Sequence, residues 1–174
     1  MKNERASDMA EIVLDHYDFK GKGVVDFGCG YGDMLCNALA AGAKHALGFD
    51  IDPGPLQYAA TKCCGFDNVD FAVRKIEELV DEDEVRGDVA FCFSVLPYIK
   101  YPGLFVKWMG DRFPVVFIEC QYFGDGPGNI AKDDESMSRW LREWGFDMVM
   151  LCGQTHVVGR DMYRSVWKCY RLEI

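Results

Sequence analysis

The stretch "VVDFGCGYGDML", residues 24–35, joins a short apolar run to a segment with helical spacing through three glycines. The apolar run predicts a buried β-strand, because it is brief and ends at residues that favour turns. After the glycines, apolar residues recur on one face of a helix: Met34, Leu35, Ala38 and Leu39. The stretch therefore predicts a strand, a tight turn and a helix, with Gly42 ending the helix.

The same alternation continues along the chain. We expect strands at 23–28, 45–50, 69–73, 88–95, 114–120, 146–151 and 164–170. We expect helices at about 7–19 with Ser7 as its cap, at 55–63 after Pro53 and Pro55, at 104–109, and at 136–144 with Asp133 or Asp134 as its cap. Strands that alternate with helices pair in parallel, and the last two, joined by a loop alone, pair antiparallel. The predicted fold is one α/β domain over residues 1–174, a Rossmann-like seven-stranded sheet with helices on both faces and an antiparallel last strand.

Composition narrows the range of partners. A net charge of −9 argues against nucleic acid, since phosphate binding requires clustered Lys and Arg. The most apolar stretch, residues 89–99, is too short to cross a bilayer, and the first residues lack the apolar core of a signal peptide. We therefore expect a cytoplasmic protein with no membrane partner.

The eight cysteines are scattered through strand-like and helix-like segments. No CxxC spacing occurs, and Cys63 and Cys64 are adjacent, so the sequence indicates neither a zinc site nor a thioredoxin-like site. We expect reduced core thiols, as in cytoplasmic proteins, and no metal. The stretch "DIDPG" resembles the start of a calcium loop, but Thr61 occupies the twelfth position, where a bidentate Glu is required.

The glycines lie where an open parallel sheet binds ligands, at the carboxyl end of a strand. Glycine accepts positive φ there and lets a ligand approach the backbone. Asp50 ends the next strand, 22 positions after Gly28. A carboxylate at about this offset binds the two hydroxyls of a ribose. Together the two features predict an adenosine-type ligand.

The glycine spacing differs from the dinucleotide pattern G-x-G-x-x-G. The third glycine arrives one residue early, at Gly32, and Asp33 occupies its expected position. Asp26 and Asp33 would repel a phosphate, whereas a zwitterionic amino acid fits: Asp26 can bind an ammonium group while glycine N–H groups and the helix start face a carboxylate.

The motif "VVDFGCGYG" followed by "GFDID" resembles motif I and the following acidic motif of the class I S-adenosylmethionine-dependent methyltransferases. "VDFAVRKIEEL" is similar to the third-strand segment of that family, and "DVAFCFSVLPYI" to its fourth-strand motif. The resemblance covers essentially the whole chain, and motif I with its spaced acidic residue is the specific part.

The resemblance implies an S-adenosylmethionine site. Asp26, Gly28 and Gly30 would hold the amino-acid end, with backbone from Cys29 and Tyr31. Asp50 would bind the ribose and Ile51 would lie against the adenine. The family often has an acidic residue near the adenine amine, where this chain has Lys75, so the backbone of Ile76 would replace that contact. Phe93 and Ser94 would pass near the methionine part.

Methyl transfer from a sulfonium needs alignment and exclusion of water more than a catalytic motif. The Asn-Pro-Pro-aromatic motif of amino-methylating nucleic-acid enzymes is absent. Loops at 94–101, 121–129 and 153–161 should form the acceptor side, with "GDGPGN" as a lid. Their candidate residues are Tyr98, Tyr101, Tyr122, Asp125, His156 and Arg160. We take His156 and Tyr98 as the catalytic candidates, His156 because its unperturbed pKa lies near neutrality.

The predicted function is transfer of a methyl group from S-adenosylmethionine to a small-molecule or peptidic acceptor. One alternative is a cofactor-binding partner subunit without activity of its own, favoured by Lys75 and by the missing base motif. A second is a nicotinamide-dependent oxidoreductase, which the glycine spacing disfavours.

Overall fold

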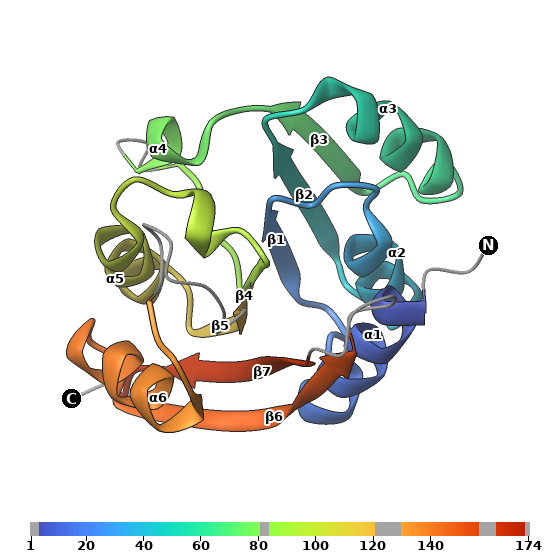
Figure 1. The fold of residues 1–174 in the computed structure, drawn as a ribbon. Helices are drawn as coiled ribbons and strands as arrows, with labels where there is room; N and C mark the ends of the chain where they lie inside the picture. The colour runs from blue at the N-terminus through green and yellow to red at the C-terminus, as the bar shows by residue number, and fades with distance from the viewer. Residues whose placement is uncertain (1–3, 81–83, 121–129, 157–162, 173–174) are drawn as a thin grey trace.

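The computed structural model describes residues 4–80, 84–120, 130–156 and 163–172, with no account of the side chains of residues 4–6. Its centre is a seven-stranded sheet in the order β3-β2-β1-β4-β5-β7-β6 (Figure 1). The strands are β1 Gly23–Phe27, β2 His45–Asp50, β3 Val69–Val73, β4 Val89–Phe93, β5 Val115–Cys120, β6 Met148–His156 and β7 Tyr163–Tyr170. β1 to β5 pair in parallel, whereas β7 pairs antiparallel with both β5 and β6, as predicted.

The helices form one layer on each face of the sheet (Figure 1). They are α1 Glu4–His16, α2 Asp33–Ala40, α3 Pro53–Lys62, α4 Ile76–Leu79, α5 Pro102–Arg112 and α6 Asp134–Glu143, with a short 3₁₀ turn, η1, at Leu96–Tyr98. α1, α2 and α3 cover one face, over an apolar core that includes Val13, Leu35 and Phe91. α4, α5 and α6 cover the other, over a core that includes Phe105 and Met137.

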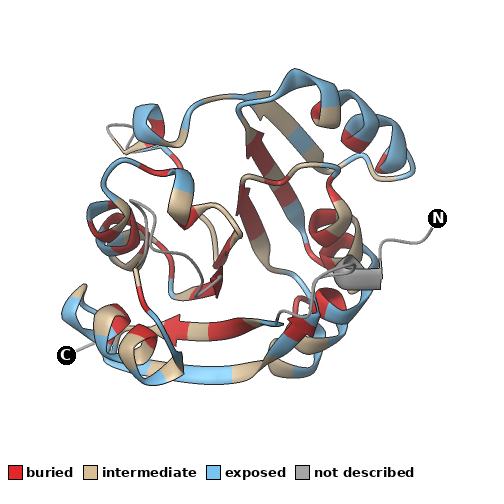
Figure 2. Cartoon of the chain, viewed as in Figure 1, coloured by how far each residue is buried: buried red, intermediate tan, exposed pale blue. Residues whose placement is uncertain are grey.

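Burial follows this layering. The central strands are buried on both faces, as Figure 2 shows, because helices cover them on each side. β3, at one end of the sheet, has no residue in the fully buried class. Within the residues that the structure describes, no helix is long and apolar enough to span a membrane.

Several predicted boundaries were wrong. The first helix runs from Glu4 to His16, so Ser7 lies inside it and is not its cap. The fourth strand ends at Phe93, because Ser94 adopts a left-handed backbone conformation with φ 63°. The choice between Asp133 and Asp134 is resolved: the Asp133 side chain accepts a hydrogen bond from the Ser136 N–H, and Asp134 is the first helical residue. The sequence reading missed α4, whose four residues are too few to show periodicity.

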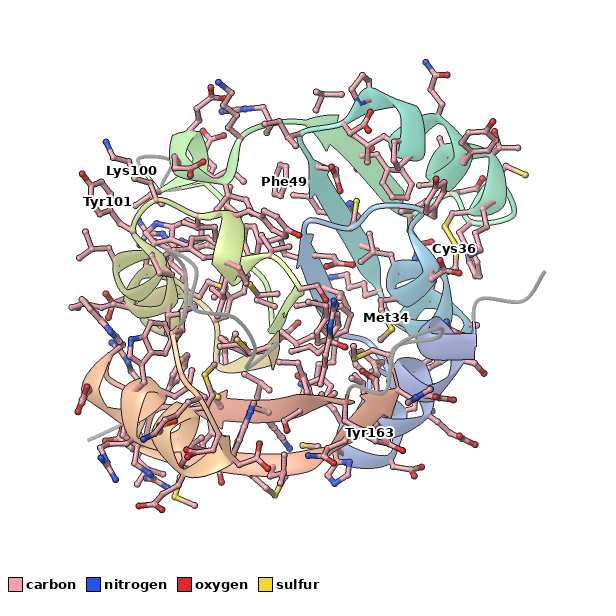
Figure 3. The ribbon with its side chains drawn as sticks, viewed as in Figure 1. Met34, Cys36, Phe49, Lys100, Tyr101 and Tyr163 are labelled. Carbon is pink, nitrogen blue, oxygen red and sulfur yellow. A yellow bond between two sulfur atoms is a disulfide. The ribbon has the colours of Figure 1, made fainter. Side chains whose placement is uncertain are left out.

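The expectation of reduced thiols is contradicted at two positions. Cys36 on α2 and Cys63, which caps α3, form a disulfide across 27 residues of sequence (Figure 3). The disulfide forms because the packing of α2 against α3 brings the Cα atoms of Cys36 and Cys63 to 5.8 Å, within the range that a disulfide requires. An ion pair between Lys62 and Asp33 joins the same two helices. The other six cysteines, all within the described residues, form no disulfide, and four of them are buried.

Candidate functional site

The turn between β1 and α2 forms the floor of the candidate site. Gly28, Gly30 and Gly32 all have positive φ, between 51° and 81°. Two of these positions also exclude a side chain by contact. A Cβ on Gly28 would lie 2.2 Å from Val95 Cγ2, and one on Gly32 would lie 2.9 Å from Ala59 Cβ. The glycines therefore give both the left-handed turn and the close packing of the neighbouring segments.

Asp50 lies at the carboxyl end of β2, beside this turn. Its carboxylate accepts a hydrogen bond from the Gly30 N–H at 2.8 Å and one from the Asp52 N–H at 3.0 Å. The N–H groups of Gly28 and Cys29 donate to the Phe49 carbonyl, which fixes the turn against β2. The Asp50 carboxylate and the Gly30 amide thus lie side by side at the carboxyl edge of the sheet.

Two adjoining cavities open at this edge of the sheet. The larger has a volume of about 380 Å³ and contains Asp50, Ile51, Lys75 and Ile76 in its lining. The smaller has about 190 Å³ and is lined by Asp26, Cys29 and Gly30, among others. Gly28, Phe93 and Ser94 line both. Every residue predicted to hold the cofactor therefore lines one cavity or both, and the two cavities meet at the end of β4.

Asp26 gives the smaller cavity its distinctive electrostatics. The residue is 3% exposed, and its Oδ1 atom has no hydrogen-bond partner among the described residues. Burial, with a smaller contribution from the nearby Asp50 carboxylate, raises the pKa of Asp26 from 3.8 to about 8. A buried carboxyl group without a partner is costly unless a ligand supplies one. A cationic group fits this cavity, since it would favour the ionised carboxylate.

The thiol of Cys29 is also held neutral. Burial, followed by the charges of Asp26 and Asp50, raises its pKa far above the ordinary value for cysteine. Its backbone N–H is bound to Phe49. Cys29 therefore contributes shape to the smaller cavity and is a poor nucleophile.

The acceptor-side candidates separate into three groups. Tyr98 lines the rim of the larger cavity and is 85% exposed. Tyr101 and His156 line neither described cavity; Lys100 lies over the Tyr101 ring, and His156 lies against Tyr163 (Figure 3 labels Lys100, Tyr101 and Tyr163). Tyr122, Asp125, Arg160 and the predicted lid at 124–129 fall outside the described residues.

A buried polar cluster was missed by the sequence reading. Ser94, Glu119, Thr155 and Arg164 come from the carboxyl ends of β4, β5 and β6 and from the start of β7. Glu119 and Thr155 are fully buried. The sequence does contain a signal for this cluster. The stretch "VVFIEC" places one charged residue, Glu119, inside an otherwise apolar strand, and a charged residue is seldom buried without a partner.

The fold and the site define a Rossmann-like α/β protein with two adjoining cavities at the carboxyl edge of its sheet, the smaller of which contains a buried carboxyl group. The family model described as "Methyltransferase domain" matches residues 24–108, which contain the glycine turn, Asp50 and the end of β4. This match covers just under half of the chain, and together with the fold it supports membership of the class I S-adenosylmethionine-dependent methyltransferase superfamily.

Curated relatives match parts of the chain. The ribosomal protein L11 methyltransferase of Sodalis glossinidius is 58% identical over 40 residues, which cover 23% of this chain and 14% of that protein. The protein of the same name from Colwellia psychrerythraea is 33% identical over 103 residues, 57% of this chain and 33% of that protein. The matches thus span a third or less of these relatives.

Solved structures share the fold over nearly the whole chain. A magnesium protoporphyrin IX methyltransferase from Synechocystis PCC 6803, crystallised with bound SAH, has a TM-score of 0.75 at 16% identity, covering 96% of this chain and 82% of that one. A putative S-adenosylmethionine-dependent methyltransferase from Listeria monocytogenes has a TM-score of 0.72 at 18% identity, covering 97% and 99%. At these identities the likeness establishes the fold.

Proposed function

We propose that this chain transfers a methyl group from S-adenosylmethionine to a small-molecule or peptidic acceptor. The observation that carries the proposal is the pair of cavities that meet at Gly28, Phe93 and Ser94. The Asp50 carboxylate in the larger cavity suits the ribose of a nucleoside. The smaller cavity suits a cation, because Asp26 is buried there and its Oδ1 atom has no hydrogen-bond partner among the described residues. A molecule with a nucleoside at one end and an ammonium group near the other matches both.

Each half of the cofactor would meet residues suited to it. Asp50 would bind the ribose hydroxyls, and the exposed Ile51 would cover the adenine, with Lys75 and Ile76 in the lining of the same cavity. Asp26 would face the ammonium group, while the glycine amides and the start of α2 would face the carboxylate. When bound, S-adenosylmethionine supplies an electrophilic methyl group, so the chain has to align a nucleophile with it and exclude water.

The acceptor is proposed from the character of the surface and from the relatives. A net charge of −9 disfavours nucleic acid as acceptor. The curated relatives are named for a ribosomal protein, which supports a peptidic acceptor, and a structural neighbour is named for a porphyrin, which supports a small molecule. Screening peptide and metabolite fractions separately for methyl incorporation would distinguish the two.

Cofactor binding gives the direct test. We expect isothermal titration calorimetry to detect binding of S-adenosylmethionine and S-adenosylhomocysteine to the wild-type chain. Asp50→Ala should weaken both by about a hundredfold, because a bidentate contact with the ribose is lost. Asp70→Ala is the matched control, since Asp70 is an exposed carboxylate on β3 that lines neither cavity. Absence of heat with both ligands would refute the proposal.

Turnover separates an enzyme from a cofactor-binding partner subunit. We expect the isolated chain to form S-adenosylhomocysteine when it is supplied with an acceptor fraction, and Asp50→Ala to form none above background. Binding without any such product, and product appearing on addition of a second protein, would favour the partner-subunit function instead.

A further inference from the structure

The Cys36–Cys63 disulfide lies beside the glycine turn of the candidate site (Figure 3). Cys36 is in the first turn of α2, and its N–H donates to the Gly32 carbonyl oxygen at 3.0 Å. Cys63 Sγ lies 3.9 Å from the same oxygen atom. Both cysteines therefore approach Gly32, the last glycine of the turn that lines the smaller cavity.

This disulfide joins the two segments that carry the predicted cofactor residues. α2 follows the glycine turn directly, and α3 begins shortly after Asp50. A Cβ on Gly32 would lie 2.9 Å from the Cβ of Ala59, so α3 packs tightly against the turn. The Gly30 N–H donates to the Asp50 carboxylate at 2.8 Å. A looser contact between α2 and α3 would therefore loosen the turn and its alignment with Asp50.

The surroundings of the disulfide suit a bond that opens and closes. An ion pair between Lys62 and Asp33 joins α2 and α3 independently of the sulfur atoms, so the two cysteines would stay close after reduction. A reduced Cys63 would carry an S–H hydrogen, and the Gly32 carbonyl lies within reach to accept it. The reduced form thus has its own contacts at this position, and the bond can form again.

The remaining cysteines agree with a reversible bond. Six cysteines form no disulfide, and Cys64, the neighbour of Cys63, is an exposed thiol. A chain with so many free thiols is typical of a reducing compartment. Disulfides in such compartments are usually transient or redox-sensing rather than permanent.

We propose that Cys36 and Cys63 form a reversible redox site, opened by a dithiol reductant, and that its opening weakens the binding of S-adenosylmethionine at the glycine turn. This inference rests on the proposed function, because it assumes that the cofactor binds at this turn. Binding to the reduced chain requires the turn to be ordered against α3, at a cost in conformational entropy. In the oxidised chain the disulfide already provides that order.

The exchange reaction has a defined direction. Cys36 is partly exposed whereas Cys63 is fully buried, so a thiolate of the reductant attacks Cys36 Sγ. A new disulfide forms there, and the old bond breaks with its electron pair on Cys63 Sγ, which takes a proton from water. The second thiolate of the reductant then attacks the reductant's own sulfur and releases Cys36, which takes a second proton. The two cysteines gain two electrons and two protons, and the reductant becomes a disulfide.

The affinity of the two forms for S-adenosylhomocysteine gives the first test. The wild-type chain is oxidised with oxidised glutathione or reduced with dithiothreitol, and thiols are counted in denaturant; we expect six in the oxidised chain and eight in the reduced chain. Titration calorimetry should show about fivefold or weaker affinity in the reduced chain, the lower end of the usual coupling between two sites. Both forms are the same polypeptide, so no substitution can disturb this comparison.

Two variants assign the effect to this disulfide. Cys36→Ser cannot form the bond, so its affinity should be the same with and without reductant and should match that of the reduced wild type. Cys64→Ser is the matched control, because Cys64 is an exposed thiol beside Cys63 that forms no disulfide. This variant should keep the wild-type ratio of the two affinities.

Thermodynamic linkage gives a second, independent measurement. If the oxidised chain binds the ligand more tightly, the ligand must favour the disulfide by the same factor. Titration of the wild-type chain in glutathione redox buffers, with and without saturating S-adenosylhomocysteine, should therefore show the thiol–disulfide equilibrium shifted by the ratio that calorimetry measures.

Equal affinities of the oxidised and reduced wild-type chain would overturn the redox site and leave the proposed function intact. So would eight thiols after treatment with oxidised glutathione, or a reductant effect that persists in Cys36→Ser. Failure of both forms to bind S-adenosylhomocysteine would overturn the proposed function itself.

Discussion

Replacing Asp26 with asparagine removes a fully buried carboxyl group from the smaller cavity while keeping its size and shape. The pKa of Asp26 is raised from 3.8 to about 8, mainly by burial. Each tenfold change in proton affinity is worth about 1.4 kcal/mol, so the whole difference corresponds to on the order of 5 kcal/mol. This free energy opposes ionisation of Asp26 in the folded protein without ligand.

The sign of the pH dependence follows from where the proton is bound. Between about pH 4 and pH 8 the folded chain keeps a proton on Asp26 that the unfolded chain has lost. The free energy of unfolding should therefore decrease as pH rises through this window, and Asp26→Asn should remove this contribution. Urea denaturation at several pH values between 4 and 8 would measure the difference between the two proteins.

Cofactor binding should reverse the protonation of Asp26. An ammonium group in the smaller cavity favours the carboxylate, so binding at pH 7 should release close to one proton from the wild-type chain. Calorimetry in phosphate and in Tris, whose ionisation enthalpies differ, should give different binding heats for the wild type and equal heats for Asp26→Asn. Equal heats for the wild-type chain, or parallel stability curves for the two proteins, would refute the reasoning.

Two further predictions concern the turn and the disulfide. Gly28→Ala should lower the free energy of unfolding by about 2–4 kcal/mol, because the new Cβ meets Val95 at 2.2 Å and the backbone is left-handed. Gly30→Ala should lower the free energy of unfolding by only about 1–2 kcal/mol, because its new Cβ has nothing within 4 Å and only the left-handed backbone is strained. If thermal melts show equal losses of stability for Gly28→Ala and Gly30→Ala, the contact with Val95 does not explain the loss at Gly28. Reduction of the Cys36–Cys63 disulfide, which spans 27 residues, should lower the free energy of unfolding by about 2–4 kcal/mol. A Cys36→Ser variant that is as stable as the wild type in denaturant would show that the disulfide does not stabilise the fold.

The fold was predictable because its signals are local and repeated. Each of the seven strands shows a short apolar run in sequence, and the helices after β1 and β2 carry clear caps or apolar stripes. The features that were missed depend on a few residues or on tertiary contacts. α4 has four residues, and the disulfide exists because packing brings α2 and α3 together.

The cofactor side of the site was predictable for a similar reason. Gly28, Gly30 and Asp50 have a spacing that the geometry of one β-α-β unit imposes. The cluster of Ser94, Glu119, Thr155 and Arg164 joins four strands, and its pairing depends on how β7 inserts between β5 and β6. No regular interval in the sequence encodes that arrangement, so the acceptor side required the structure.

The irregular pairing of β6 has a consequence for solubility. β6 forms one border of the described sheet, and its register with β7 shifts between Leu151 and Gly153. A straight border strand offers its unpaired amides and carbonyls to another molecule, which favours aggregation, and a bulge twists the strand out of that geometry. Exposed Met148, Met150 and Leu151 add apolar surface along this border. The register shift between Leu151 and Gly153 thus disfavours pairing of β6 with a strand of another molecule.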